Sequence, residues 1–316
     1  MKVPTLRGAD SPGTEGSEHV RSSDGGLQRT ALQSFQRALL GWYHARSRTL
    51  SIRSARDPWA ILVSEVMAQQ TQIARVDQAW ALFMRRFPTP RALADASSAA
   101  VLRAWSGLGY NRRAISLQRA ARIIEAEHGG RVPADIEALE GLPGVGPYTS
   151  RAVAAIAFGR PVAAVDTNVR RVVTRSLGRP LSAAELQRAA DELVYRADVA
   201  TWTHASMELG ATVCRATDPL CPTCPVARWC ASSGSVNAPA PIRGGRNVPF
   251  EQTTRWLRGR IVDHLREIDD DAWFELPGSL GAHGPTEIAA AVAALERDGL
   301  LEMSPDGWVR LPSTTT

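Results

Sequence analysis

All four cysteines of the chain lie within one short segment, as metal ligands often do. Cys214, Cys221, Cys224 and Cys230 are separated by six, two and five residues. A cluster of this kind indicates a metal site rather than a disulfide framework. Four thiolates bind either a tetrahedral zinc ion or a [4Fe–4S] cluster. The spacing alone does not decide between them, although zinc sites usually pair two C-x2-C units and only one is present here.

Two acidic residues stand in settings that suit acid and cation-stabilising chemistry. Glu65 lies in ILVSEVMAQQT, an otherwise apolar helical stretch. Burial there raises the pKa of a carboxyl and keeps it protonated; the alternative is an exposed face of an amphipathic helix. Asp166, in AAVDTNVRRVV, is a good N-cap for the helix that follows. Two carboxylates in unlike environments can divide the roles of acid and charge stabiliser between them.

The segment LEGLPGVGPYTSR predicts a turn that binds phosphate between a short and a longer helix. Gly144 and Gly146 flank Val145, and Leu142 opens the turn. Glycine permits positive φ and a close approach of another backbone. Successive N–H groups near a helix N-terminus hold a phosphate oxygen. An ordinary helix–helix turn is the alternative, and Tyr148, directly after the turn, is then a packed helix aromatic.

The elements that must position these residues are nearly all helical. Residues 1–27 are rich in Gly, Ser and charge and predict a disordered leader. Asp57 and Pro58 suit the N-cap and first position of the helix that carries Glu65. Apolar spacing predicts further helices from about 28 to 232, at 75–86, 98–105, 111–127, 135–140, 147–158, 167–176, 182–196 and 202–213.

After residue 232 the pattern changes. Residues 233–252 are rich in Ser, Gly, Pro and Ala and predict a linker. Two helices, at 254–268 and 285–299, precede two short strands around Pro305-Asp306-Gly307. This order predicts a small winged-helix-like α+β module over residues 253–316.

The composition restricts the class of protein. A chain of 316 residues has room for two domains. No apolar run reaches the ~18 residues of a membrane helix and the N-terminus has no signal-peptide pattern, so we expect a cytoplasmic protein. The net charge of +5 and the pI of about 9.4 suit a nucleic-acid partner. Lys2 is the only lysine, so no lysine of the folded body can form a Schiff base with a sugar aldehyde.

Taken together, the motifs resemble one family over about residues 30–232. They are SEVMxQQT at Ser64 to Thr71, GLGY at 107–110, the LPGVG turn, VDTN around Asp166 and the cysteine spacing. This set resembles the helix-hairpin-helix (HhH-GPD) DNA glycosylases, and most closely the MutY-type adenine glycosylases. The resemblance implies an all-α, two-lobed fold, with a six-helix lobe at about 52–160 and a cluster lobe at about 28–51 plus 161–232. It also implies that the four cysteines bind a [4Fe–4S] cluster rather than zinc.

The resemblance also implies roles for individual residues. Glu65 protonates the adenine, and Asp166, supported by Asn168, stabilises the cationic sugar. Tyr148 stands where bifunctional relatives carry the Schiff-base lysine, so we expect base release without strand cleavage. Gln70 and Tyr110 match positions that wedge into the DNA beside a flipped base, and Thr71 belongs to the same DNA-contacting motif.

The implied substrate is adenine opposite 8-oxoguanine or guanine in double-stranded DNA, bound by a monomer associated with the nucleoid. Several positions depart from the family pattern: LPWR is Leu50-Ser51-Ile52-Arg53, so Ile52 replaces the tryptophan of the base pocket while Arg53 is kept. His204 stands where a base-reading residue is often found. The remaining departures are Ala68 and Asn111. The alternatives are removal of mismatched thymine or uracil, a bifunctional lyase, and a DNA-binding iron–sulfur protein without catalysis.

Overall fold

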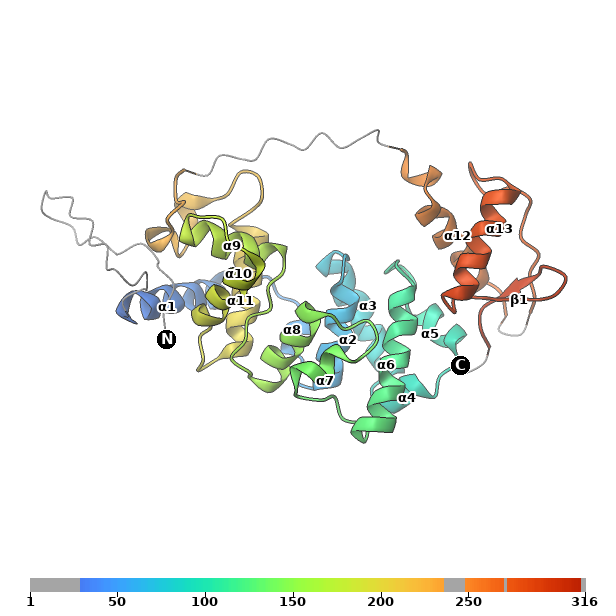
Figure 1. Ribbon diagram of the computed structural model, residues 1–316, viewed down its shortest axis with the longest axis horizontal. Helices are drawn as coiled ribbons and strands as arrows, with labels where there is room; N and C mark the ends of the chain where they lie inside the picture. The colour runs from blue at the N-terminus through green and yellow to red at the C-terminus, as the bar shows by residue number, and fades with distance from the viewer. Residues whose placement is uncertain (1–28, 236–247, 270–271, 314–316) are drawn as a thin grey trace, which may run out of the picture. The chain divides into compact units, whose positions relative to one another are not determined.

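The computed structural model describes residues 29–235, 248–269 and 272–313, and these residues are mainly helical (Figure 1). The expected leader at 1–27 and most of the expected linker lie outside them. The chain divides into two compact units, each made of two separate segments. Unit 1 comprises Met1–Thr49 with Pro147–Pro241, and unit 2 comprises Leu50–Gly146 with Ile242–Thr316.

Unit 1 holds five of the described α-helices and two short 3-10 turns. They are α1 (Arg29–Arg46), α8 (Pro147–Phe158), α9 (Thr167–Leu177), α10 (Ala183–Leu193), α11 (Val199–Thr212), η2 (Cys221–Thr223) and η3 (Ala227–Trp229). The sequence places the boundary between the lobes near residue 160, whereas α8 belongs to unit 1 because it packs along α11.

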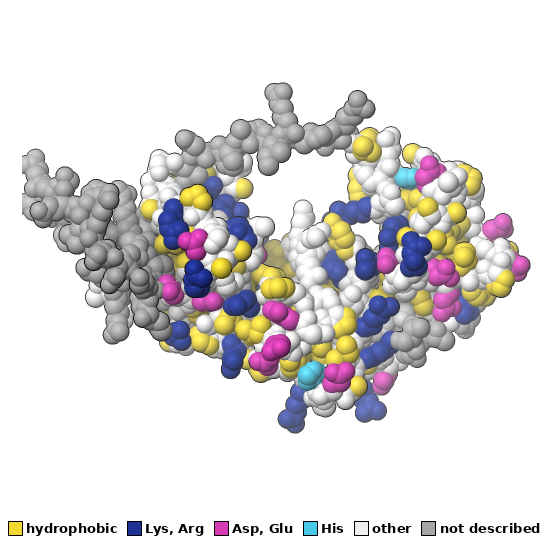
Figure 2. All heavy atoms as spheres, viewed as in Figure 1, with side chains coloured by type: hydrophobic (Ala, Val, Ile, Leu, Met, Phe, Trp, Pro, Cys, Tyr) yellow, Lys and Arg dark blue, Asp and Glu magenta, His cyan; other side chains and the backbone are white. Residues whose placement is uncertain are grey.

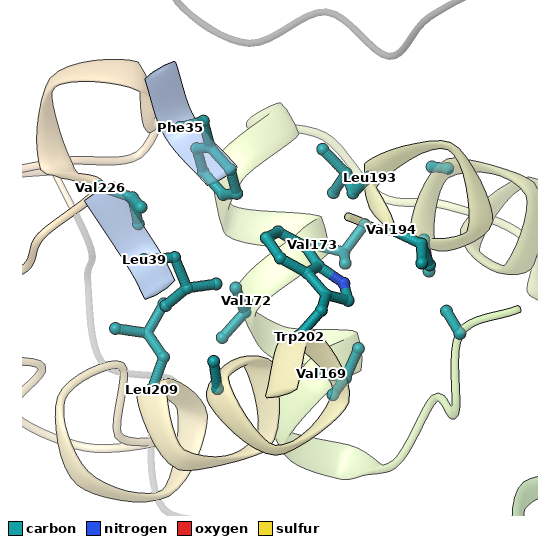
Figure 3. Packing of buried hydrophobic residues seen from close by; sticks show 14 of the residues in the cluster. Phe35, Leu39, Val169, Val172, Val173, Leu193, Val194, Trp202, Leu209 and Val226 are labelled. Carbon is teal, nitrogen blue, oxygen red and sulfur yellow. The ribbon is translucent and has the colours of Figure 1, made fainter. Parts of the chain in front are cut away.

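The core of unit 1 is built from side chains at helical spacing on α1, α9 and α11 (Figure 3). Phe35 and Leu39, four residues apart on α1, are almost completely buried. The Phe35 ring lies 6.2 Å from the rings of both Trp202 and Trp229. Since Trp229 follows the third cysteine by five residues, this aromatic contact ties the cysteine segment to the core.

Unit 2 holds the remaining described helices and the only described strand pair. They are η1 (Ser51–Ser54), α2 (Pro58–Ala68), α3 (Ile73–Arg86), α4 (Pro90–Ala94), α5 (Ser98–Ala104), α6 (Arg112–His128), α7 (Ile136–Glu140), η4 (Phe250–Gln252), α12 (Thr254–Arg266), α13 (Pro285–Arg297), β1 (Glu302–Met303) and β2 (Val309–Arg310). None of the helices in the described ranges of either unit is long and apolar enough to cross a membrane.

Helix α2 begins as the sequence predicts and is buried on nearly all sides. The Asp57 carboxylate accepts the N–H groups of Trp59 and Ala60, and Pro58 occupies the first turn. Trp59 is buried and donates its indole N–H to the carbonyl of Phe87. The helix that carries Glu65 is therefore held by both its cap and its packing.

The C-terminal segment of unit 2 consists of α12, α13 and a short antiparallel pair. Glu302 pairs with Arg310 in this β1–β2 ladder, and their side chains form an ion pair of 2.8 Å. Phe274 forms an isolated bridge with Val309 on the other side of β2. The two helices and the two strands occupy the ranges that the sequence predicts, to within a few residues.

Candidate active site

Glu65 lies on α2, half-buried, within a helix whose other residues are almost all inaccessible to solvent. Its neighbours Ser64 and Val66 are 5% and 1% exposed. The helix ends three residues later at Ala68 and leads directly into the turn with Gln70 and Thr71. The carboxyl therefore lies at the end of a rigid element, next to a segment that is open to solvent.

The two residues expected to wedge into DNA share an unusual backbone conformation. Gln70 has φ of 55° and Tyr110 has φ of 47°; both are exposed, Tyr110 to 37%. Positive φ in a residue other than glycine costs about 1–3 kcal/mol and is concentrated at functional sites. Both loops are therefore held in strained shapes that present these side chains.

Arg113 holds the two loops and the end of α2 together. One guanidinium nitrogen donates to the carbonyls of Val66 (2.9 Å) and Met67 (2.8 Å). The other donates to the Thr71 hydroxyl (3.0 Å) and, on the second loop, to the carbonyls of Leu108 (3.1 Å) and Gly109 (3.0 Å). Burial lowers the pKa of Arg113 to about 10, which still leaves it charged at neutral pH.

The glycine turn lies against the same loops. The side-chain amide of Gln69 donates to the Gly144 carbonyl at 3.0 Å. Leu142 and Val145 are 2% and 6% exposed, and the Val145 N–H donates to the Leu142 carbonyl at 3.0 Å. Only the exposed backbone at Gly144 and Gly146 is thus open to a phosphate, while the two apolar side chains anchor the turn.

The segment expected to line the base pocket is fixed to α3. Ile52 and Arg53 are half-buried in η1, and Asp77 accepts both the Ile52 N–H (3.0 Å) and the Ser51 hydroxyl (2.8 Å). This acid on α3 sets the position of η1, whatever side chain stands at 52.

In unit 1, Asp166 forms the cap that the sequence predicts. One carboxylate oxygen accepts the Val169 N–H at 2.6 Å and the other accepts the side-chain amide of Asn168 at 2.9 Å. The Arg171 guanidinium donates to the side-chain oxygen of Asn168 at 2.8 Å. It also donates to the backbone carbonyls of Gly210 and Cys214, both at 2.6 Å. One chain of hydrogen bonds thus links the carboxylate to the first cysteine.

Tyr148 and His204 lie in α8 and α11 of the same unit, both half-buried. The Tyr148 hydroxyl lies 3.7 Å from the sulfur of Met207, one turn along α11 from His204. Because α8 packs along α11, the two predicted site residues lie on neighbouring helices.

The four cysteines are half-buried free thiols. Burial raises the pKa of Cys224 to about 11, and the other three cysteines contribute to the shift, so each of them lies within electrostatic range of Cys224. Arg175 donates to the Cys214 sulfur at 3.5 Å, and the Cys230 thiol donates to the Arg175 carbonyl at 3.4 Å. Within the described ranges, no three His, Cys, Asp or Glu side chains are placed to hold a single metal ion. A [4Fe–4S] cluster binds each thiolate through a different iron and accepts more widely spaced ligands.

Comparison with known proteins places these features in a family. Residues 63–195 match the HhH-GPD superfamily of base excision DNA repair proteins. The chain is 41% identical over 292 residues to the adenine DNA glycosylase of Mycobacterium tuberculosis, which covers 87% of this chain and 92% of that protein. The chain belongs to the HhH-GPD superfamily, among the adenine DNA glycosylases.

Solved structures agree with this assignment at the level of the fold. A thermostable thymine-DNA glycosylase superposes with a TM-score of 0.60 and 28% identity, covering 64% of this chain and 96% of its own. Endonuclease III in a trapped covalent complex with DNA superposes with a TM-score of 0.56 and 26% identity, covering 66% and 97%.

Three residues that position the site have no place in the sequence motifs: Arg113, Arg171 and Glu208. Arg113 and Arg171 donate hydrogen bonds to backbone carbonyls, and such acceptors leave no signature in the sequence. The only available signal for Arg113 was its place three residues after GLGY. Glu208 is 1% exposed on α11 and forms a bidentate pair with Arg48, with both contacts at 2.7 Å. An acid within the apolar face of α11 was the only available signal for Glu208.

Proposed function

We propose that this DNA N-glycosylase of base excision repair hydrolyses the N-glycosidic bond of adenine mispaired with 8-oxoguanine or guanine in double-stranded DNA. The identity of 41% over 87% of the chain to an adenine DNA glycosylase carries the proposal. The capped, immobilised Asp166 and the half-buried Glu65 support it, because the two carboxyls stand in unlike surroundings.

In the proposed reaction the bond between the sugar carbon and the adenine nitrogen breaks. Glu65 gives its proton to the adenine ring, which leaves as a neutral base. The Asp166 carboxylate, fixed by Val169 and Asn168, stabilises the oxocarbenium-like sugar. Water adds to that carbon, and its proton restores the Glu65 carboxyl. The target adenine must leave the base stack before it can react, and the side chains of Gln70 and Tyr110, which have positive φ, fill the gap that it leaves.

The products are an abasic site and free adenine, with the strand intact. A lyase needs an amine that forms a Schiff base, and Lys2 is the only lysine of the sequence. Tyr148 occupies the position after the glycine turn, and its hydroxyl contacts Met207. A phenol at this position offers no amine for a Schiff base.

The proposal includes a [4Fe–4S] cluster on Cys214, Cys221, Cys224 and Cys230. The mutual electrostatic influence of the four thiols and the Arg175 contacts support it. When bound, the cluster would hold the four cysteines together and so make the segment that carries Arg215 and Arg228 rigid. Purified protein should contain about four iron atoms and four sulfides per chain. Cys221→Ser should lose them, and protein with full activity but no iron or sulfide would contradict the assignment.

A panel of mismatched duplexes tests the substrate. We expect release of adenine opposite 8-oxoguanine and guanine, and none of thymine or uracil opposite guanine. Glu65→Gln removes the proton donor and should slow single-turnover base release by about 10²–10⁴-fold while DNA is still bound. The control is Glu127→Gln, an exposed acid on α6, which should leave the rate unchanged.

Removal of thymine or uracil from mismatches is the second candidate. The superposition with a thymine-DNA glycosylase supports it, as do the departures at Ile52 and Asn111. Release of pyrimidine without adenine would replace our proposal with this one, and an inactive chain that binds DNA would replace both.

A further inference from the structure

The C-terminal segment from α12 onward, here called the C-terminal module, is docked on α5 and α6 by side chains from both partners. Arg266 of α12 donates to the Leu102 carbonyl at 2.9 Å. Arg103 of α5 donates in return to the carbonyls of Arg266, at 3.2 Å, and Ile268. The Ala99 N–H at the start of α5 donates to the Pro312 carbonyl at 3.0 Å. These contacts hold the C-terminal end of α12 and the segment that follows β2.

One of the docking contacts is made by Asn111, the residue that follows Tyr110. The Arg266 guanidinium, buried enough that its pKa is lowered, donates to the Asn111 side-chain oxygen at 2.8 Å. Asn111 is one of the positions where the sequence departs from the family pattern. The Asn111 amide is an acceptor for the module, so the residue at this position has a structural role.

The docked module brings a second arginine onto Tyr110. Arg255, on the first turn of α12, lies 3.9 Å from the centre of the Tyr110 ring, and Arg113 lies 5.6 Å from it. A planar guanidinium stacks on an aromatic face and keeps its donors free at its edge. The exposed ring of Phe250 also lies near Arg255, at 5.7 Å.

Arg255 carries a positive charge without an acidic partner in the described part of the chain. Among the described residues, no acidic side chain forms an ion pair with exposed Arg255, and the Arg255 charge helps to lower the pKa of Arg113. Figure 2 shows arginine side chains gathered around α12 and the facing end of α6. Two like charges held on one exposed ring, in a strained loop, indicate an anionic ligand.

We propose that the C-terminal module is part of the DNA-binding surface and that Arg255 binds a backbone phosphate of the strand into which Tyr110 is inserted. This inference rests on the proposed function, since a wedge residue implies duplex DNA. Stacking on Tyr110 positions the guanidinium, and the phosphate neutralises the charge that it shares with Arg113. Such a contact strengthens binding without reading sequence.

Binding of a fluorescent duplex with a central mismatch, measured over a series of salt concentrations, tests this contact. Arg255→Gln should weaken binding about tenfold at ~0.1 M salt and reduce the slope of log K against log salt by ~1. Arg255→Lys keeps the charge and should keep the slope. The matched control is Arg260→Gln on the same helix, an exposed arginine with only a 3.9 Å pair to Asp263, and it should behave as the wild type.

Equal affinity and slope for Arg255→Gln and Arg260→Gln would overturn the inference. Weaker binding of Arg255→Gln with an unchanged slope would also overturn it, because Arg255 would then only support Tyr110. Base release by the wild-type protein is scored separately on the mismatch panel. Failure there with a reduced slope for Arg255→Gln refutes the substrate and leaves the phosphate contact standing.

Discussion

At the scale of single residues, the two glycines of the LPGVG turn do different things. Gly144 has φ of 83°, and a Cβ on it would lie 2.9 Å from the Cβ of Ser116 on α6. Gly146 has no such φ, and a Cβ on it would meet nothing within 4 Å. The first glycine is therefore required by the fold of the turn, whereas the second keeps the backbone before α8 open to a ligand.

We expect Gly144→Ala to lower the free energy of unfolding by about 1–3 kcal/mol, because it forces an alanine into positive φ and against α6. Gly146→Ala should change stability by less than about 0.5 kcal/mol and still weaken DNA binding, since the methyl group occupies the place of the phosphate. Denaturant unfolding and duplex binding of both variants separate the two effects. Equal stability loss in both, or normal DNA binding by Gly146→Ala, contradicts this division.

At the scale of elements, local signals predicted most of what the structure contains. Helix α8 spans 147–158 as predicted, and Asp57 with Pro58 starts α2. Helix α4 was missed although Thr89 and Pro90 carry the same cap and proline signal. Helix α11 begins three residues before its predicted start because Asp198 caps it by accepting the Thr201 N–H.

The sequence could not predict how the elements are joined. Arg113 has no sequence signal beyond its place in a predicted helix, because four of its five acceptors are backbone carbonyls that any sequence provides. The docking of the C-terminal module on Asn111 depends on two segments 155 residues apart. For the site, the sequence named Asp166 and Asn168 and the structure joins them, while the link through Arg171 to Cys214 appears only in three dimensions.

Arg113 is the residue through which α2 and the two wedge loops act as one element. We expect Arg113→Ala to lower base release by about 10²-fold or more with a smaller effect on affinity, because misplacing catalytic groups by about 1 Å costs this much. Arg113→Lys keeps the charge but cannot reach five acceptors, so it should rescue little. Single-turnover rates and duplex affinities of both variants give the readout.

Arg119→Ala, an exposed arginine on the same helix, is the control for that experiment and should match the wild type. If Arg113→Lys releases adenine at the wild-type rate, charge alone is sufficient and the hydrogen-bond geometry does not position the loops.

At the scale of the whole molecule, each unit is assembled from segments that are distant in the sequence. Unit 1 combines the N-terminal helix with residues after 146, and unit 2 combines residues 50–146 with the C-terminal module. The chain therefore passes between the units at three places, and each unit needs contacts that join its own segments. In unit 2 these are the docking contacts of Arg266 and Arg103; in unit 1 they include the pair of Arg48 and Glu208.

The Arg48–Glu208 pair predicts how unit 1 responds to loss of one charge. Glu208 accepts the guanidinium in a bidentate arrangement, and this side-chain hydrogen bonding raises the pKa of Arg48. Glu208 also accepts the Arg48 backbone N–H at 3.3 Å. The Arg48 side chain is 46% exposed, so it regains water when its partner is removed. We expect Glu208→Gln to lower the free energy of unfolding by about 1–3 kcal/mol, below the 3–5 kcal/mol of a pair buried on both sides.

Glu208→Gln should also disturb the position of Tyr148, because Glu208 is next to Met207 on α11 and the Met207 sulfur contacts the Tyr148 hydroxyl. A double-mutant cycle with Arg48→Gln, followed by denaturant unfolding, measures the coupling. If the pair joins the two segments, Arg48→Gln should cost more than Glu208→Gln, because it leaves the buried Glu208 carboxylate without its guanidinium, and the double variant should cost little more than Glu208→Gln alone. Additive losses would mean that Glu208 stabilises α11 through its own surroundings, and that the N-terminal helix is held on unit 1 by other contacts, such as those of Phe35, Leu39 and the buried Gln36 amide.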